Sequence, residues 1–141
     1  MRAQGIATFA VAFGLLVASG RAGTATKGPD RRAAAKGQIT YVRYCVSCHG
    51  PVARGDGPLA GDLRIAAPDL TTLGTRNGGV FPYSRVVRII KSGEVRPGHG
   101  SLDMPAWGDA FRETKGAEGA SVDEAIANLA HFVRSLQQPA T

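Results

Sequence analysis

Cys45-Val46-Ser47-Cys48-His49 places two thiols three positions apart, with an imidazole directly after the second thiol. Side chains three positions apart near a helix end lie on the same face. Each thiol can then reach one vinyl group of a porphyrin and form a thioether bond, while the imidazole lies beneath the iron as its proximal ligand. The C-x-x-C-H spacing therefore predicts covalent attachment of one haem at Cys45 and Cys48, with His49 as an iron ligand.

Three other uses of the two cysteines fit the sequence less well. A tetrahedral zinc site needs four ligands, and the remaining histidines, His99 and His131, lie far apart without the usual H-x₃₋₅-H spacing. A thioredoxin-like redox pair needs a βαβ context, for which the chain shows no pattern. A disulfide across two intervening residues is strained, and the chain has no further cysteine with which to exchange.

The second iron ligand must come from another part of the chain. Met104 is the only methionine apart from Met1, and Pro105 directly after it stiffens the backbone that presents the sulfur. A neutral thioether favours Fe(II) over Fe(III), so a His/Met pair raises the reduction potential. Two alternatives stay open: Met104 can be a core residue that fills a gap, and His99 can be the ligand instead.

The N-terminus has the features of a secretory signal peptide. Arg2 precedes an uncharged run, residues 3–20, whose apolar centre has the length of an h-region and is short for a bilayer span. Small residues follow, as a cleavage site requires. We expect residues 1–22 to be a signal peptide, or alternatively an uncleaved anchor, and residues 23–29 to be a polar tether. The remainder is then exported to the periplasm and meets a membrane only if the N-terminal segment is retained.

The composition fits one exported domain. With 141 residues the chain has little room for a second domain, which excludes a multidomain enzyme. Hydrophobic residues make up 43%, too many for a disordered chain. A formal charge of +6, two units of which Arg2 and Arg21 contribute, is too small to argue for a nucleic-acid partner. We therefore expect a single domain over residues 30–138.

The first predicted helix is capped by Asp30 and runs from Arg31 to about Cys45. Gly37 in its interior costs nearly ~1 kcal/mol relative to alanine, and the close approach of another helix is the expected offset. Four residues at helical spacing share one face of this helix: Ala33, Gly37, Tyr41 and Tyr44.

Two more helices are predicted further along the chain, with a short one between them. Residues 84–92 form an apolar side and a basic side, and Gly93 ends this helix. The short helix follows Pro105 and carries Trp107. The last helix begins at the S-x-x-E capping box of Ser121 and Glu124. Its apolar stripe, which leaves His131 on the solvated side, consists of Val122, Ile126, Leu129, Val133 and Leu136.

Residues 50–79 separate the first two long helices and are rich in glycine and proline. This composition predicts a long irregular stretch with few regular elements. A loop of that length does not usually organise itself within a domain. A haem offers a large flat apolar surface, so we expect the loop to pack on the cofactor.

Taken together, these features resemble the class I monohaem c-type cytochromes, over residues 31–138. Residues 48–58 (CHGPVARGDGP) and 67–70 (APDL) are similar to segments of bacterial members. The resemblance implies an all-α cytochrome c fold, in which three to five helices and long Gly/Pro-rich loops surround one covalently bound haem c. It implies that the first and last helices cross at Gly37, with Tyr41 and Phe132 alongside. It also implies a backbone carbonyl that holds the ligand imidazole, for which Pro68 is the candidate.

The ligand set and the resemblance imply an outer-sphere electron carrier rather than an enzyme, because both axial positions are filled by protein groups. Trp107, Arg76 and Arg96 are candidate partners of the haem propionates, although each arginine can equally be a solvated surface charge. The expected partners are exported redox proteins that dock weakly and transiently. The basic side of residues 84–92 (Arg85, Arg88 and Lys91) can contact an acidic partner or simply face water. The lysine-rich docking face of mitochondrial-type members is missing.

Two other functions stay open. A haem-based sensor or peroxidase would need a displaceable sixth ligand, which loss of the iron–Met104 bond would create. An electron-entry subunit of an exported dehydrogenase or terminal oxidase would use the same chemistry within a permanent complex.

Overall fold

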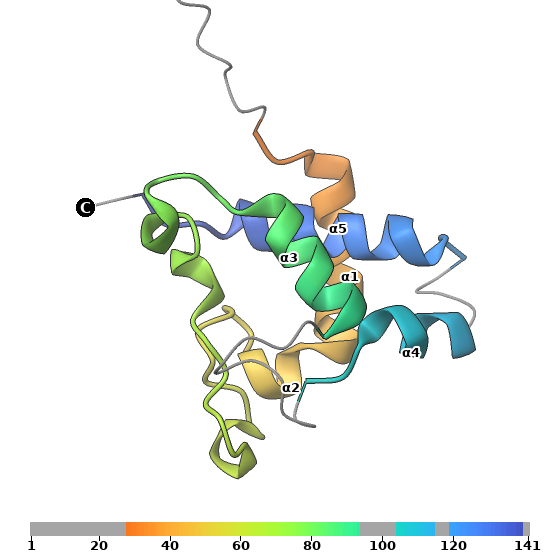
Figure 1. Cartoon of the computed structure of the whole chain (residues 1–141), viewed down its shortest axis with the longest axis horizontal. Coiled ribbons are helices and arrows are strands. Elements are labelled where there is room, and N and C mark those ends of the chain that lie inside the picture. The colour runs from red at the N-terminus through yellow and green to blue at the C-terminus, as the bar shows by residue number, and fades with distance from the viewer. Residues whose placement is uncertain (1–27, 94–103, 115–118, 140–141) are drawn as a thin grey trace, which may run out of the picture.

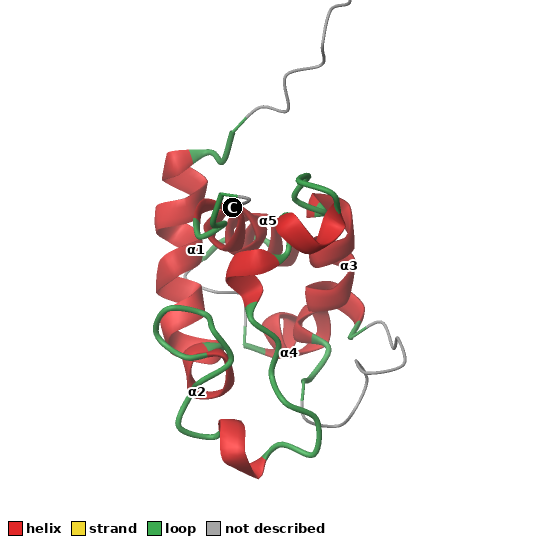
Figure 2. Ribbon diagram, turned by 90° about the vertical axis from the view of Figure 1, so that its left-hand side faces the viewer, coloured by secondary structure: helices red, strands yellow, loops and turns green. Residues whose placement is uncertain are grey.

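The computed structural model describes residues 28–93, 104–114 and 119–139. These residues form helices and loops without a strand, which confirms the predicted all-α class (Figure 2). The predicted signal peptide, most of the tether, Arg96 and His99 lie outside the described residues. The α-helices are α1 (Arg31–Tyr44), α2 (Val46–His49), α3 (Tyr83–Ser92), α4 (Trp107–Glu113) and α5 (Val122–Ser135). The 3₁₀ turns are η1 (Ala60–Asp62), η2 (Leu70–Thr72) and η3 (Thr75–Asn77).

The centre of the fold is the crossing of α1 and α5, with α3 and α4 packed beside it (Figure 1). At Gly37 the two backbones touch: a Cβ atom there would overlap the carbonyl of Asn128 and lie 2.8 Å from the amide nitrogen of Leu129. The rings of Tyr41 and Phe132 lie 5.0 Å apart beside this point. The expected crossing of the first and last helices at a glycine is therefore confirmed.

The buried face of α1 is shifted from the one predicted. Ala34, Gly37, Thr40 and Tyr41 are buried, whereas Ala33 is only half-buried. Ala34 and Tyr41, one turn before and one turn after Gly37, are both buried, so the face that contacts α5 is turned from Ala33 toward Ala34. A helical wheel carries no information about the direction of the partner helix.

Both long helices have the predicted N-caps. The Asp30 carboxylate accepts hydrogen bonds from the amides of Arg32 and Ala33, at 2.9 and 3.1 Å. The Ser121 hydroxyl accepts one from the amide of Glu124 at 3.2 Å. The Glu124 carboxylate accepts a bond from Lys36 Nζ at 3.0 Å, so this side chain links α5 to α1.

The expectation that His131 is solvated is wrong. Its ring is half-buried, its Nδ1 accepts a hydrogen bond from the amide of Asp30 at 3.1 Å, and the ring of Tyr83 lies 5.1 Å away. The apolar stripe of α5 is only part of its contact surface, because the starts of α1 and α3 pack on the adjoining face. Sequence periodicity does not reveal such a second contact face.

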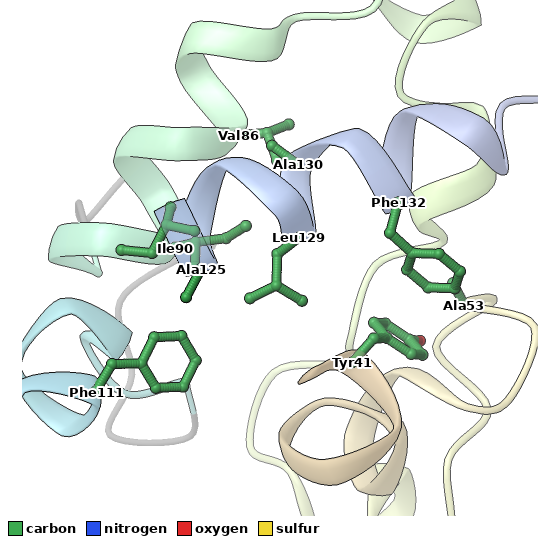
Figure 3. Close-up of a cluster of buried hydrophobic side chains, with 10 residues drawn as sticks. Tyr41, Ala53, Val86, Ile90, Phe111, Ala125, Leu129, Ala130 and Phe132 are labelled. Atoms are coloured by element: carbon green, nitrogen blue, oxygen red, sulfur yellow. The ribbon is translucent and has the colours of Figure 1, made fainter. Parts of the chain in front are cut away.

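The core lies around α5 (Figure 3). Helix α3 contributes Val86 and Ile90 and ends, as predicted, at Gly93 with φ of 59°. Helix α4 contributes Phe111, whose ring lies 5.3 Å from that of Tyr44 at the end of α1. In the part of the chain that is described, no helix has the length and apolar character needed to cross a membrane.

The glycine-rich segment is largely irregular, as predicted, and its only regular elements between α2 and α3 are three short 3₁₀ turns. It first folds back on α2: the amides of Gly55 and Gly57 donate to the carbonyls of His49 and Cys48, at 2.9 and 3.2 Å. Gln137, just beyond α5, then holds its far end by donating to the carbonyl of Leu70 at 2.7 Å. The loop is thus attached at both ends and forms a wall between them.

Candidate haem-binding site

The two cysteines and the histidine of the C-x-x-C-H motif lie at the junction of α1 and α2. Helix α1 ends at Tyr44, Cys45 has a φ of −116°, and the chain resumes as the single turn α2. Cys45 and Cys48 are half-buried free thiols, and both line the same cavity as His49. The local backbone therefore presents the three motif side chains to one space.

That space is an apolar cleft with an empty volume of about 980 Å³, including its part open to solvent. A second cavity adjoins it, and the residues common to both show that the two are sections of one crevice. Most of these shared residues are aliphatic, as the faces of a porphyrin require. The shared lining residues are His49, Pro68, Leu70, Ile89, Ile90, Met104 and Val133.

His49 is in the state that a metal ligand needs. Burial lowers its pKa, while the backbone carbonyl of Pro68 acts in the opposite direction. The ring is therefore neutral at pH 7, with a lone pair available for iron. Its Nδ1 is buried and makes no hydrogen bond of regular geometry with the described residues, although the Pro68 carbonyl lies close enough to influence its pKa. A porphyrin in the crevice suits this imidazole, because rotation of the ring toward Pro68 would pair Nδ1 and leave Nε2 for the iron.

Cys45 lacks the lowered pKa of a redox-active thiol. Burial, with a smaller contribution from Cys48, raises its pKa to about 12. A thioredoxin-type cysteine needs a lowered pKa, so this environment disfavours the redox-pair alternative. Within the described ranges, no three His, Cys, Asp or Glu side chains converge as a zinc site would require.

The remaining candidate residues from the sequence analysis lie at different parts of the crevice. Met104 is half-buried just before α4 and lines both cavities together with His49. Trp107 lines the first cavity and packs on Tyr44 with ring centres 5.5 Å apart. Arg76 lines the second cavity, where its guanidinium donates to the carbonyl of Asp69 at 2.5 Å.

Sequence reasoning missed Tyr41 as part of the site. Its hydroxyl donates to the carbonyl of Gly50 at 2.7 Å, directly after the motif, and its side chain lines the first cavity. Burial and the nearby Cys45 raise the pKa of this phenol, so the donor stays protonated. Tyr41 was identified only as a residue of the helix-crossing face; its bond to Gly50 depends on the path of the loop after α2.

Sequence reasoning also placed Arg85 on a solvated or docking face. Arg85 is exposed, as the solvated interpretation expects, but it also lines the second cavity, and its guanidinium donates to Asn77 Oδ1 at 3.2 Å. The sequence does contain a signal for this position. Arg85 lies four residues before Ile89, so the two share one side of the helix, and Ile89 lines the crevice.

Comparison with known proteins gives two similarities. Residues 32–133 match the family described as cytochrome c oxidase, cbb3-type, subunit III. A chain of the Kuenenia stuttgartiensis reducing HAO-like protein complex Kustc0457/Kustc0458 has a similar structure, with a TM-score of 0.53 and 26% sequence identity. That match covers 79% of this chain and 47% of the other, so this chain spans about half of its length. No curated protein sequence matches the chain.

Proposed function

The chain belongs to the family described as cytochrome c oxidase, cbb3-type, subunit III, and on this basis we propose that it is a one-electron carrier with His/Met ligation. Membership makes the chain a c-type cytochrome with covalently bound haem c, and electron transfer is the function typical of such a domain. Our proposal adds the residues: thioether bonds at Cys45 and Cys48, and axial ligands from His49 and Met104.

One observation carries the ligand assignment. His49 and Met104 come from segments more than fifty positions apart in sequence, yet both line both cavities of the same apolar crevice. Met104 is also the only sulfur besides the two cysteines among the described residues. A core-filling methionine needs no such shared exposure to the crevice, so the arrangement favours the ligand role over the gap-filling one.

When bound, haem c supplies an iron that alternates between Fe(II) and Fe(III). The residues of this chain set the conditions for that change. Met104 favours the reduced state as a neutral soft ligand. The Pro68 carbonyl would orient the imidazole of His49 once the ring turns toward it. The aliphatic walls would exclude water, which disfavours the added charge of the oxidised state.

If His49 and Met104 both bind the iron, no coordination position would be left for a substrate. We therefore propose that it transfers electrons through an exposed edge to redox proteins that dock weakly, and that it is not an enzyme. The sensor or peroxidase alternative would require displacement of Met104.

The N-terminal sequence supports export of this domain. We propose that residues 1–22 direct the chain to the periplasm, that residues 23–29 are a tether, and that residues 30–138 are the cytochrome c domain. If the first segment is retained as an anchor, the domain works at the membrane surface. Mass spectrometry of the exported protein locates its N-terminus and distinguishes cleavage from retention.

Spectroscopy of the Met104→Ala variant tests the ligand assignment. The protein is produced in a host that attaches haem c, and one haem per denatured chain is verified by mass. Oxidised wild type is expected to show the weak far-red absorption band of a thioether–Fe(III) bond, and the variant to lack it and to bind carbon monoxide rapidly when reduced. Retention of the band in the variant would refute the role of Met104. Leu73→Ala, which changes another partly buried wall residue, is the matched control and is expected to keep the band.

A second candidate function is an electron-transfer subunit of a permanent complex. The similarity to a chain of the reducing HAO-like protein complex, and the family description, favour this possibility. Its chemistry is the same and only the lifetime of the contact differs. A partner that copurifies at a fixed ratio through a high-salt wash would support the subunit role, whereas a monomeric cytochrome would support the shuttle.

A further inference from the structure

We propose that Arg76 and Arg85, the latter positioned by Asn77, form a carboxylate-binding edge of the crevice that holds the haem propionates. This inference rests on the proposed haem-c function, but it does not depend on which residue is the sixth ligand. It assigns Arg85 to the cofactor site instead of to a docking face, and it includes Asn77, which no sequence pattern indicated.

The charge balance of the second cavity is the first argument. Among the described residues, its lining is apolar apart from His49, Arg76, Asn77 and Arg85, and none of these lining residues carries a carboxylate. Two guanidinium groups therefore border one apolar space without an acidic partner in its wall. A porphyrin with two carboxylates on one edge complements such a wall, since its ring fits the aliphatic part and its propionates fit the arginines.

The arginines are held in place by other groups of the chain, which is the second argument. Asn77 Oδ1 accepts a hydrogen bond from Arg85 at 3.2 Å, and Asn77 Nδ2 donates to the carbonyl of Val80 at 2.8 Å. Arg76 donates to the carbonyl of Asp69 at 2.5 Å. Each guanidinium has five N–H donors, so a single such bond restrains the group and leaves donors for a bidentate contact with a carboxylate.

One carboxylate does lie near Arg76, although it is not part of the cavity lining: that of Asp69. It accepts hydrogen bonds from the amide and the hydroxyl of Thr71, at 2.8 and 2.6 Å, and so caps η2. The hydroxyl of Thr71 lowers the pKa of Asp69 most, and the positive charges of Arg54 and Arg76 lower it further. Asp69 therefore offsets part of the charge of Arg76, whereas Asn77, the side chain that Arg85 contacts, is neutral.

The other basic residues of α3 behave differently from Arg85. Lys91 forms an ion pair with Asp123 at 2.6 Å, and Arg88 donates to the carbonyl of Ser84 at 3.4 Å. Neither lines the crevice. Arg88 is exposed on the same helix as Arg85, so Arg88→Gln is a matched control for the loss of one positive charge from α3.

The test uses the haem-loaded protein and measures the midpoint potential from about pH 5 to about pH 9, together with infrared spectra of the carboxyl groups. In wild type we expect ionised propionates and a nearly level potential across this range. Arg85→Gln removes a positive charge beside the cofactor, which stabilises Fe(III) and lowers the potential. The same substitution raises the pKa of the propionates. We therefore expect a pH range in which the potential falls as the pH rises, and an infrared band of protonated carboxyl groups at the acid end of that range.

Two further variants separate charge from positioning. Arg85→Lys keeps the charge and loses the planar fork, so its potential is expected between those of wild type and Arg85→Gln. Asn77→Ala leaves both arginines present, and the pH-dependent region is expected to appear in weaker form because Arg85 is no longer restrained. A purely structural role of Asn77 would lower stability without creating that region.

The proposal is overturned if Arg85→Gln and Arg88→Gln give the same potential, slope and carboxyl band. Each variant is first shown to carry one haem per chain and to keep the iron-ligand spectrum of wild type, whichever sixth ligand that spectrum reports. Loss of attachment in wild type itself would contradict the haem-c function, so failure of the two proposals can be distinguished.

Discussion

Replacement of Gly37 by alanine tests the helix crossing on which the site is built. A Cβ atom at this position meets only backbone atoms of α5: the carbonyl carbon and oxygen of Asn128 and the amide nitrogen of Leu129. Backbone atoms cannot turn away as a flexible side chain can. The two helices must therefore move apart, which loosens the contact between Tyr41 and Phe132 at the same crossing.

The size of the effect follows from two opposing contributions. Alanine in place of glycine gains up to about 1 kcal/mol of helix propensity. Overpacking a tight core typically costs about 1–3 kcal/mol, and a clash with a rigid backbone lies at the upper end of that range. We therefore expect Gly37→Ala to lower the free energy of unfolding by about 2 kcal/mol, even though alanine is the better helix residue.

The measurement is denaturant unfolding of the haem-loaded protein, followed by far-ultraviolet circular dichroism. Gly61→Ala is the matched control, because Gly61 lies in η1 and a Cβ atom there has no neighbour within 4 Å. This control is expected to be neutral or to stabilise by up to about 1 kcal/mol. If Gly37→Ala were as stable as wild type, the close backbone contact between α1 and α5 would be refuted.

Three further substitutions test separate parts of the fold. Tyr41→Phe deletes the donor to the buried carbonyl of Gly50 and is expected to cost about 1–3 kcal/mol of unfolding free energy, measured by denaturant; a change below the error would contradict the bond. Asp69→Asn removes a carboxylate whose pKa is lowered chiefly by the hydrogen bond from Thr71. Because the pKa is lower in the folded protein, the ionised carboxylate stabilises the fold at pH values above its unfolded pKa, and this stabilisation is lost as the pH falls below about 4. The variant is therefore expected to be less stable than wild type at pH 7, and the difference is expected to disappear in acid. A difference in thermal unfolding that stays constant with pH would refute this assignment. Ser121→Ala removes the N-cap of α5 and is expected to cost about 1 kcal/mol, whereas Ser121→Asp restores the cap.

The parts of the fold that could be predicted are those with local causes. Asp30 and Ser121 cap their helices through side chains only two or three residues away from the amides they accept from, so the sequence contains all the partners. The C-x-x-C-H motif is equally local, because three side chains on adjoining turns form it. Gly37 was informative for another reason. A glycine weakens the helix that contains it, so its presence indicates a close contact that leaves no room for a side chain.

The parts that could not be predicted depend on the path of the loops. His131 was assigned to solvent because the wheel of α5 shows one apolar stripe, whereas the amide of Asp30, 101 positions earlier in the chain, donates to its ring. Arg85 was treated as part of a basic helix face, and only the return of residues 75–82 places it with Asn77 at the crevice. Both contacts join polar groups that are not neighbours on one helix face, so amphipathic periodicity cannot report them.

The two sides of the crevice differ in how the chain holds them, and this difference bears on reactivity. His49 follows the rigid crossing of α1 and α5, is adjacent to the Gly50 carbonyl that Tyr41 holds, and accepts a further bond from Gly55. Met104 is presented by Pro105 and the short helix α4, whose own contribution to the buried core is Gly108 and Phe111. Local opening occurs where buried contacts are few, so it should begin on the methionine side. If His49 and Met104 are the iron ligands, as proposed, any peroxidase or gas-binding activity would then arise by release of Met104, with His49 kept on the iron.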